Sequence, residues 1–163
     1  MNNHATLALD LGRNLGWALC VDGKITHSGV EVLHKDGMPP GYAYANFDNF
    51  LTGFHQVDEV FYENITFFKS RYQMKLWHGF LSHLEKYCFV TGIKFHGIAV
   101  PTWKKALTTS GRSDKVQVCD YLREKGWGRG VAGTDQYNDE ADACGIIIAI
   151  MRGRDVEVEF AYD

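Results

Sequence analysis

The sequence predicts an α/β domain built on a mixed five-stranded sheet that is flanked by helices. Three short β-rich runs come first, at residues 6–11, 15–21 and 25–33, with tight turns between them. Strand and helix patterns alternate along the rest of the chain. Consecutive strands with tight turns favour antiparallel pairing, and strands separated by helices favour parallel pairing. A chain of 163 residues can bury a sizeable core, so we expect one domain over residues 1–163.

The later elements follow from apolar periodicity and from breaks at Gly and Pro. In chain order we expect a helix at 44–54, a strand at 57–63, a helix at 71–90, a strand at 93–100, helices at about 113–125 and 138–151, and an additional edge strand at 156–160. Ser113 is a plausible N-cap for the helix that follows it. The helix at 71–90 is apolar around most of its girth, which indicates either a subunit interface or a buried central position.

Composition argues against several classes of protein. No stretch reaches the ~18–20 apolar residues needed to cross a bilayer, and the N-terminus lacks the features of a signal peptide. The four cysteines stand apart in the sequence and are expected to be free, buried thiols rather than a zinc site or a disulfide framework: Cys20, Cys88, Cys119 and Cys144. We therefore expect a cytoplasmic protein with no membrane partner.

Charge is unevenly distributed along the chain. The net charge is −3, yet residues 101–129 contain seven Lys or Arg against three acids. Lys69, Arg71 and Lys75 form a second basic group. A local basic face suits a protein that binds phosphates. On charge alone, however, a pair of solvated helix faces is the favoured explanation.

Four carboxylates at the ends of predicted elements are the candidate catalytic residues. Asp10 lies near the end of the first strand, and Glu63 ends the strand at 57–63. Asp139 and Asp142 lie three residues apart at the start of the last helix, so they share a face with Cβ atoms ~5–6 Å apart. That face continues with apolar residues and is expected to point toward the sheet. Glu140 lies off it and is expected to be solvated.

A divalent cation is the natural compensation for carboxylates beside an apolar face. Magnesium prefers oxygen ligands, and two ions ~3.5–4 Å apart can promote phosphodiester cleavage. We therefore expect the four acids to bind two Mg²⁺ or Mn²⁺ ions, with Asp10 bridging them, because hard oxygen sites accept either metal. Gly12 would leave room for an approaching phosphate. Each acid alone also has an ordinary explanation, as a turn residue, an exposed strand end or a charge at a helix N-terminus.

These residues resemble the RuvC family of Holliday-junction resolvases over nearly the whole chain. Residues 9–17 (Leu-Asp-Leu-Gly-Arg-Asn-Leu-Gly-Trp) are similar to the family's opening Asp-Pro-Gly hairpin. Residues 61–63 (Phe-Tyr-Glu) are similar to the strand that ends in its glutamate, and residues 138–143 (Asn-Asp-Glu-Ala-Asp-Ala) carry its two acidic positions at the same interval. Lys104 and Lys115 resemble its lysine-bearing segment. Any one motif is weak, but the ordered set is fairly specific.

The resemblance implies a ribonuclease H-like fold, a homodimer, two-metal-ion catalysis and paired nicks in four-way DNA junctions. It also implies that the four acids hold the metal ions and that Lys115 is catalytic at the scissile phosphate. The residues expected to bind DNA are Lys104, Lys105, Arg112, Phe67, Phe68, Lys69 and Arg71. Phe67 or Phe68 would stack on a junction base, a contact worth ~1–3 kcal/mol. Both lie one or two residues later than the family's aromatic residue, and packing under a loop is the equal alternative.

Two departures from the family's pattern indicate a divergent member. Leu11 replaces the usual proline, and the strand at 156–160 is not part of the pattern. The substrate range could therefore extend beyond intact four-way junctions. We expect the protein in the cytoplasm of a bacterial or phage-infected cell, with an organelle as the alternative. The sequence does not indicate accessory branch-migration proteins.

Other classes of protein share part of this pattern. Sugar kinases and actin-like ATPases also carry an Asp-x-Gly hairpin, but they need two such domains, and the chain has no Gly-x-x-x-x-Gly-Lys-Ser/Thr loop. A ribonuclease H-like nuclease for RNA, for RNA–DNA hybrids or for other branched DNA would use the same acids and stays open. A non-catalytic junction-binding protein also stays open, although the presence of all four acids argues against it. The seven histidines show no metal-ligand spacing and are assigned no catalytic role.

Overall fold

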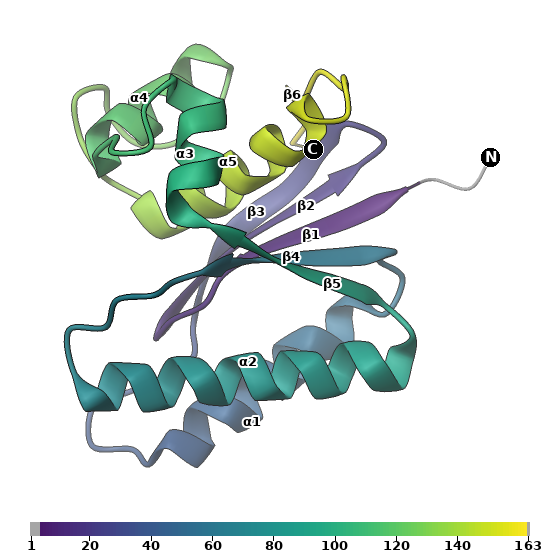
Figure 1. The fold of residues 1–163 in the computed structure, drawn as a ribbon, viewed down its shortest axis with the longest axis vertical. Helices are drawn as coiled ribbons and strands as arrows, with labels where there is room; N and C mark the ends of the chain where they lie inside the picture. Colours follow the sequence, from purple (N-terminus) through teal and green to yellow (C-terminus); the bar gives the residue numbers. More distant parts are fainter. Residues whose placement is uncertain (1–3, 163) are drawn as a thin grey trace.

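The computed structural model describes residues 4–162 and has a mixed sheet with helices on both faces (Figure 1). Its strands are β1 (Ala5–Asp10), β2 (Asn14–Val21), β3 (Lys24–Val32), β4 (Glu59–Asn64), β5 (Lys94–Ala99) and β6 (Glu159–Phe160). They lie in the order β5-β4-β1-β2-β3-β6. The pairs β1–β2 and β2–β3 are antiparallel, whereas β1–β4, β4–β5 and β3–β6 are parallel. The predicted mixed sheet is confirmed, and the additional edge strand forms over two residues as its sixth member.

The helices form two layers, one on each face of the sheet. They are α1 (Pro40–Leu51), α2 (Arg71–Thr91), α3 (Val100–Thr108), α4 (Lys115–Glu124) and α5 (Asn138–Arg152), with a 3-10 turn at Thr52–Phe54. Figure 1 shows α1 and α2 on one face and α3, α4 and α5 on the other. Each layer encloses its own apolar core against the sheet.

The alternation of side chains along β1 determines on which face of the sheet Asp10 lies. Leu7 and Leu9 belong to the core under α1 and α2, and Ala8 belongs to the core under α3, α4 and α5. Successive strand side chains point to opposite faces. Asp10 therefore lies on the same face as Ala8, toward the layer that contains α5.

Helix α2 buries one stripe of side chains rather than its whole girth. Its buried positions include Leu76, Phe80 and Leu84, whereas Phe89 and Val90 near its end are 87% and 73% exposed. The alternative of a buried central helix is therefore wrong. Whether a second subunit covers the exposed side stays a prediction.

The predicted N-cap of α4 is also wrong. Asp114, not Ser113, caps this helix: its carboxylate accepts from the backbone N–H of Gln117 at 2.8 Å, and the Gln117 side chain accepts from the Asp114 N–H at 2.9 Å. This reciprocal capping box pairs two backbone N–H groups at once, which a serine one residue earlier does not. The Ser113 hydroxyl instead donates to the Ser110 carbonyl at 2.9 Å.

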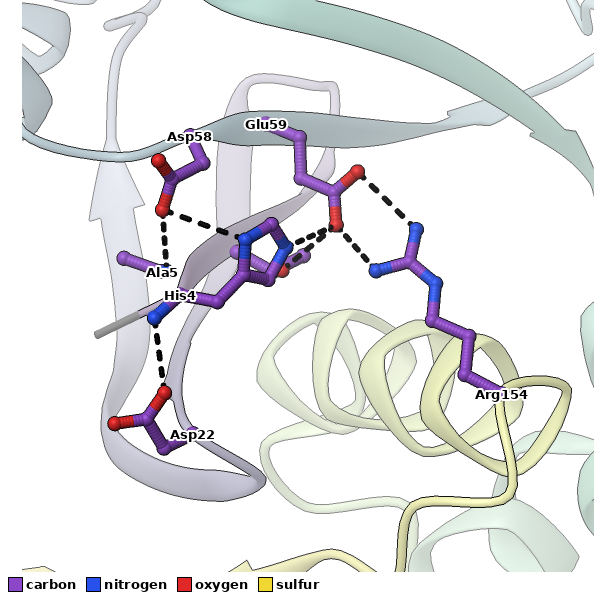
Figure 2. Close-up of polar contacts among 7 residues, drawn as sticks. His4, Ala5, Asp22, Asp58, Glu59 and Arg154 are labelled. Carbon is purple, nitrogen blue, oxygen red and sulfur yellow. Dashed lines mark hydrogen bonds and ion pairs between the residues drawn. The ribbon is translucent and has the colours of Figure 1, made fainter. Parts of the chain in front are cut away.

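A polar cluster at the start of β1 and β4 links the sheet to the end of α5 (Figure 2). The Glu59 carboxylate accepts from the Thr6 hydroxyl at 3.0 Å and lies 2.9 Å from the His4 imidazole. The Arg154 guanidinium donates to both Glu59 oxygens. Glu59 is only 5% exposed, so these partners compensate a buried charge. The cluster lies at the end of β1 and β4 opposite to Asp10 and Glu63.

Two expectations from composition can be compared with the described residues. All four cysteines are buried and free, as predicted. Within residues 4–162, no helix combines the length and the apolar character that crossing a bilayer requires.

Candidate active site

The strand register places Asp10 beside Glu63. Leu9 lies opposite Tyr62 in the parallel β1–β4 pair, so the next residue on each strand is one of these two acids. Neighbouring strands lie ~4.8 Å apart. The two carboxyls are close enough for each to influence the pKa of the other. The parallel pairing therefore brings together two acids that are far apart in the sequence.

Gly16 brings the first turn of α5 to the same place. Gly16 lies opposite Asp10 in the β1–β2 pair. A Cβ atom at Gly16 would lie only 1.8 Å from the backbone oxygen of Asp139. Only glycine permits so close an approach of backbone to backbone. Asp139 therefore lies beside the end of β1, and Asp142 follows on the next turn of the same helix.

The four predicted acids line one cleft of about 670 Å³, together with Lys104 and Lys115. Strands β1 and β4 and helix α5 supply the acids, and α3 and α4 supply the lysines. The β1–β2 turn and the start of α2 complete the lining. The cleft therefore joins a group of carboxylates to two cations and to a wall of mixed polarity.

Burial raises the pKa of all four carboxyls, and the charges of neighbouring carboxylates add to the shift at Asp10 and Asp142. Burial, followed by the charges of Glu63, Asp142 and Asp139, raises the pKa of Asp10 well above its ordinary value. Burial and the charge of Glu63 raise the pKa of Asp142 to about 7, although Lys104 and Lys115 oppose the shift. Burial also raises the pKa of Glu63 and of Asp139. Like charges in a poorly solvated site disfavour ionisation in this way.

Glu63 has a further partner that the sequence did not suggest. The Trp103 indole Nε1–H donates to Glu63 Oε1 at 3.0 Å, and Trp103 is fully buried. The next residue, Lys104, donates from Nζ to the Ser113 carbonyl at 3.0 Å. Helix α3 therefore supplies a neutral donor to one acid and an anchored cation to the cleft.

The predicted DNA-binding residues divide into those that line the cleft and those that do not. Lys115, the first residue of α4, is exposed and lines it, as does the half-buried Lys104. Lys105 and Arg112 are exposed but are not part of the lining.

The basic pair before α2 flanks a residue of the cleft. Lys69 and Arg71 are exposed on either side of Ser70, which lines it. Phe67 also lines the cleft and is 79% exposed. Phe68 instead packs with its ring centroid 5.6 Å from that of Trp77. Ordinary packing therefore describes Phe68, and Phe67 is the phenylalanine available for a ligand.

The expectation that Glu140 is solvated is wrong. Glu140 is 3% exposed, accepts a hydrogen bond from the Ser28 hydroxyl at 2.6 Å and lies 3.3 Å from Nε of Arg129. Helix α5 packs between the sheet and helices α3 and α4, so it is buried around nearly its whole girth. A single inward face was therefore too simple a description of this helix.

Gly16 and Trp103 were missed from the sequence as residues that shape the site. A glycine inside a β-rich run is a recognised sign of close backbone approach, and Gly16 follows the first acid by six residues. No comparable signal marks Trp103, because an aromatic residue in a short helix is normally interpreted as part of the hydrophobic core. Only the packing of α3 against the sheet assigns its N–H to Glu63.

The donor set fits a hard divalent cation by its chemistry. Four carboxylates supply only oxygen ligands, and burial raises the pKa of each, so a bound cation would stabilise the ionised forms that burial disfavours. Within residues 4–162, no three His, Cys, Asp or Glu side chains are grouped closely enough to hold a metal ion as they stand. The acids share a cleft, but their oxygens do not form a finished ligand set.

The sheet order, the two helical layers and the acids at the strand ends define a RuvC-like, ribonuclease H-like architecture. Two solved structures of Thermus thermophilus RuvC share it, with TM-scores of 0.67 and 0.70 and sequence identities of 17% and 20%. The first comparison covers 93% of this chain and 97% of the other; the second, a complex with Holliday junction substrate, covers 90% and 92%. The yeast mitochondrial Holliday junction resolvase Ydc2 is also similar, with a TM-score of 0.64, 16% identity and coverage of 90% and 77%.

No protein-family model matches the chain, and no curated protein sequence matches it. The similarity therefore resides in the fold.

Proposed function

We propose that this chain is a metal-dependent endonuclease that resolves four-way DNA junctions by paired nicks. The observation that carries the proposal is the meeting of Asp10, Glu63, Asp139 and Asp142 in one cleft with two lysines. The RuvC-like fold supports it, because one similar structure is a complex with Holliday junction substrate and another is named as a Holliday junction resolvase.

The four carboxylates would hold two Mg²⁺ or Mn²⁺ ions, with Asp10 the best placed to touch both. It lies between Glu63 on β4 and Gly16, against which α5 packs. Bound ions would supply an activated water and charge stabilisation at the departing 3′ oxygen. A bound cation would also favour the ionised form of these acids, which burial disfavours.

Lys115 would contact the scissile phosphate, with Lys104 beside it. Lys115 is exposed at the first turn of α4, so its ammonium can reach a phosphate oxygen. Lys104 is fixed by its bond to the Ser113 carbonyl and contributes charge at a constant place. A cation there stabilises negative charge that develops on the phosphate.

The remaining predicted contacts would bind the arms of the junction. Phe67 would stack on an unpaired base, since its ring is exposed beside the cleft. Lys69, Arg71, Lys105 and Arg112 are exposed and would neutralise phosphates farther from the cut. Paired nicks need two active sites, so we propose a homodimer, and we place the protein in the cytoplasm of a bacterial or phage-infected cell.

The test is incubation with a labelled four-way junction, duplex DNA, single-stranded DNA and an RNA–DNA hybrid, each with Mg²⁺ or EDTA. We expect Mg²⁺-dependent paired nicks restricted to the junction. Asp10→Asn should reduce cleavage by roughly 10³-fold or more but leave junction binding in EDTA intact. Asp155→Asn is the matched control, because Asp155 is exposed and has a left-handed φ of 58° that asparagine tolerates.

Each competing function predicts a different result in this assay. Cleavage of the RNA–DNA hybrid alone would indicate a ribonuclease rather than a resolvase. Binding of the junction without cleavage in the presence of either metal would indicate a non-catalytic junction-binding protein. Full cleavage by Asp10→Asn would overturn the assignment of the metal centre.

A further inference from the structure

Trp103 makes a contact that the other fully buried tryptophan does not. Its indole N–H donates to Glu63 Oε1 at 3.0 Å. Trp127 is equally buried, at 1% exposed, and its indole nitrogen has no hydrogen-bond partner among the described residues. Burial in the core therefore does not require a tryptophan N–H to find a carboxylate. The contact of Trp103 with Glu63 is specific to the site.

The surrounding packing fixes the Trp103 ring. A Cβ atom at Gly145 on α5 would lie 2.8 Å from Cζ3 of this indole, so the ring lies directly on the backbone of that helix. The Lys104 Nζ lies 5.5 Å from the ring centroid. The donor is thus held between α3 and the helix that carries Asp139 and Asp142.

A neutral donor does something that a cation in the same place would not. It fixes one oxygen of the Glu63 carboxylate but leaves the negative charge available for other partners. Glu63 follows the residue that pairs with Leu9 on β1, so it lies beside Asp10. The Glu63 carboxylate is therefore held from α3 at the place where the strand register puts Asp10.

We propose that Trp103 is a positioning residue that orients Glu63 for binding a divalent cation. The proposal rests on the role given to Glu63 in the proposed function. When a group that hydrogen-bonds to a metal-ligating side chain is removed, metal affinity typically falls by roughly 10–100-fold. Trp103 does not touch the ion or the substrate, so it acts only through Glu63.

The test compares Trp103→Phe with Trp127→Phe. Both remove an indole from the same buried core, but only Trp103→Phe removes the hydrogen bond. Mg²⁺ and Mn²⁺ affinities are measured without DNA, by calorimetry and by the metal-induced rise in Tm. We expect Trp103→Phe to bind metal at least about 10-fold more weakly and Trp127→Phe to match the wild type. The effect of Trp103→Phe should disappear in a Glu63→Gln background.

A second readout separates positioning from damage to the fold. In junction cleavage, Trp103→Phe should raise the Mg²⁺ concentration for half-maximal rate by a similar factor, with the rate recovering at high Mg²⁺. Should Trp103→Phe not fold, the indole N–H resonances of the ¹⁵N-labelled wild type serve instead. Mg²⁺ should shift the Trp103 resonance more than that of Trp127.

Four results would overturn the proposal. Trp103→Phe and the wild type could bind metal equally well, the two variants could lose equal affinity, or Mg²⁺ could shift the Trp103 resonance no more than that of Trp127. The fourth is absence of metal binding by the wild type. Weakened metal binding by Trp103→Phe in a protein that cuts no nucleic acid would support the positioning role. That last result would contradict the proposed nuclease.

Discussion

Gly16→Ala should damage the candidate active site without touching any of its acids. The added Cβ would lie 1.8 Å from the Asp139 oxygen, 2.4 Å from its carbonyl carbon and 3.1 Å from the Glu140 nitrogen. All three atoms are backbone, so no side-chain rotation relieves the contact. Because ordinary contacts are about 3.5 Å, the first turn of α5 or strand β2 must move by roughly 1.5 Å.

The size of the effect follows from that displacement. Overpacking of a fixed interior typically costs about 1–3 kcal/mol. A shift of about 1 Å in a catalytic group can cost about 10²-fold in rate. We therefore expect Gly16→Ala to lower the free energy of unfolding by about 2 kcal/mol and junction cleavage by at least 10²-fold. Metal affinity should fall as well, because Asp139 and Asp142 move together.

The assay is urea unfolding followed by Mg²⁺ titration and junction cleavage at a concentration where the variant is folded. Gly41→Ala in α1 is the control, since no atom lies within 4 Å of its added Cβ and its φ is not positive. It should be neutral or slightly stabilising, by up to about 1 kcal/mol. Wild-type stability and wild-type metal affinity in Gly16→Ala would refute the reasoning, since α5 would then not depend on this approach.

Three further predictions concern charge and stacking. Burial raises the pKa of Asp142 from 3.8 to about 7, so its contribution to stability is fully present below pH 3.8 and is lost as the pH rises to about 7. The metal-free Tm should therefore fall over this interval, and Mg²⁺ should offset the fall. A flat profile would contradict this. Burial alone would raise the pKa of Glu59, but hydrogen bonds led by that of Arg154 lower it to about 2, so stability is lost as the pH falls from about 4.5 toward 2. In urea unfolding, Glu59→Gln should lower the free energy of unfolding by roughly 1–3 kcal/mol at neutral pH and should weaken this loss of stability in acid. An unchanged loss in acid would contradict the role given to Glu59. Phe67→Ala should weaken junction binding in EDTA by about 1–3 kcal/mol and leave the Tm unchanged, because its ring is exposed. Phe68→Ala should lower the Tm, because its ring packs against Trp77. If Phe67→Ala binds the junction as tightly as the wild type, the exposed ring has no role in binding.

The element order was predictable because local signals and tertiary structure agree over most of the chain. Turn residues separate β1, β2 and β3, and the apolar period of 71–90 is long enough to identify α2. The N-cap of α4 was predicted one residue early, because Ser113 and Asp114 are both good caps and the choice depends on Gln117. Such a choice depends on geometry that a residue pattern does not contain.

The four acids could be proposed from the sequence because each one interrupts an otherwise apolar element. Their meeting in space depends on the pairing of β1 with β4 and on the approach of α5 to Gly16, and neither is a property of a local window. Glu140 shows the limit of the helical-face argument. Helical spacing separates Glu140 from Asp139 and Asp142, but a helix buried on several sides has no solvent face to receive it.

Contacts from three different elements, β2, β3 and α3, hold the candidate active site in place. Gly16 fixes the first turn of α5 against β2, the Ser28–Glu140 bond fixes the same turn against β3, and Trp103 fixes Glu63 from α3. Gly16 and Ser28 therefore constrain the backbone that carries Asp139 and Asp142, and Trp103 constrains the Glu63 carboxylate itself. Repulsion among the four carboxylates opposes their closer approach. A divalent cation would remove that repulsion, so metal binding should bring the carboxylates closer together and leave the sheet and α5 where they are.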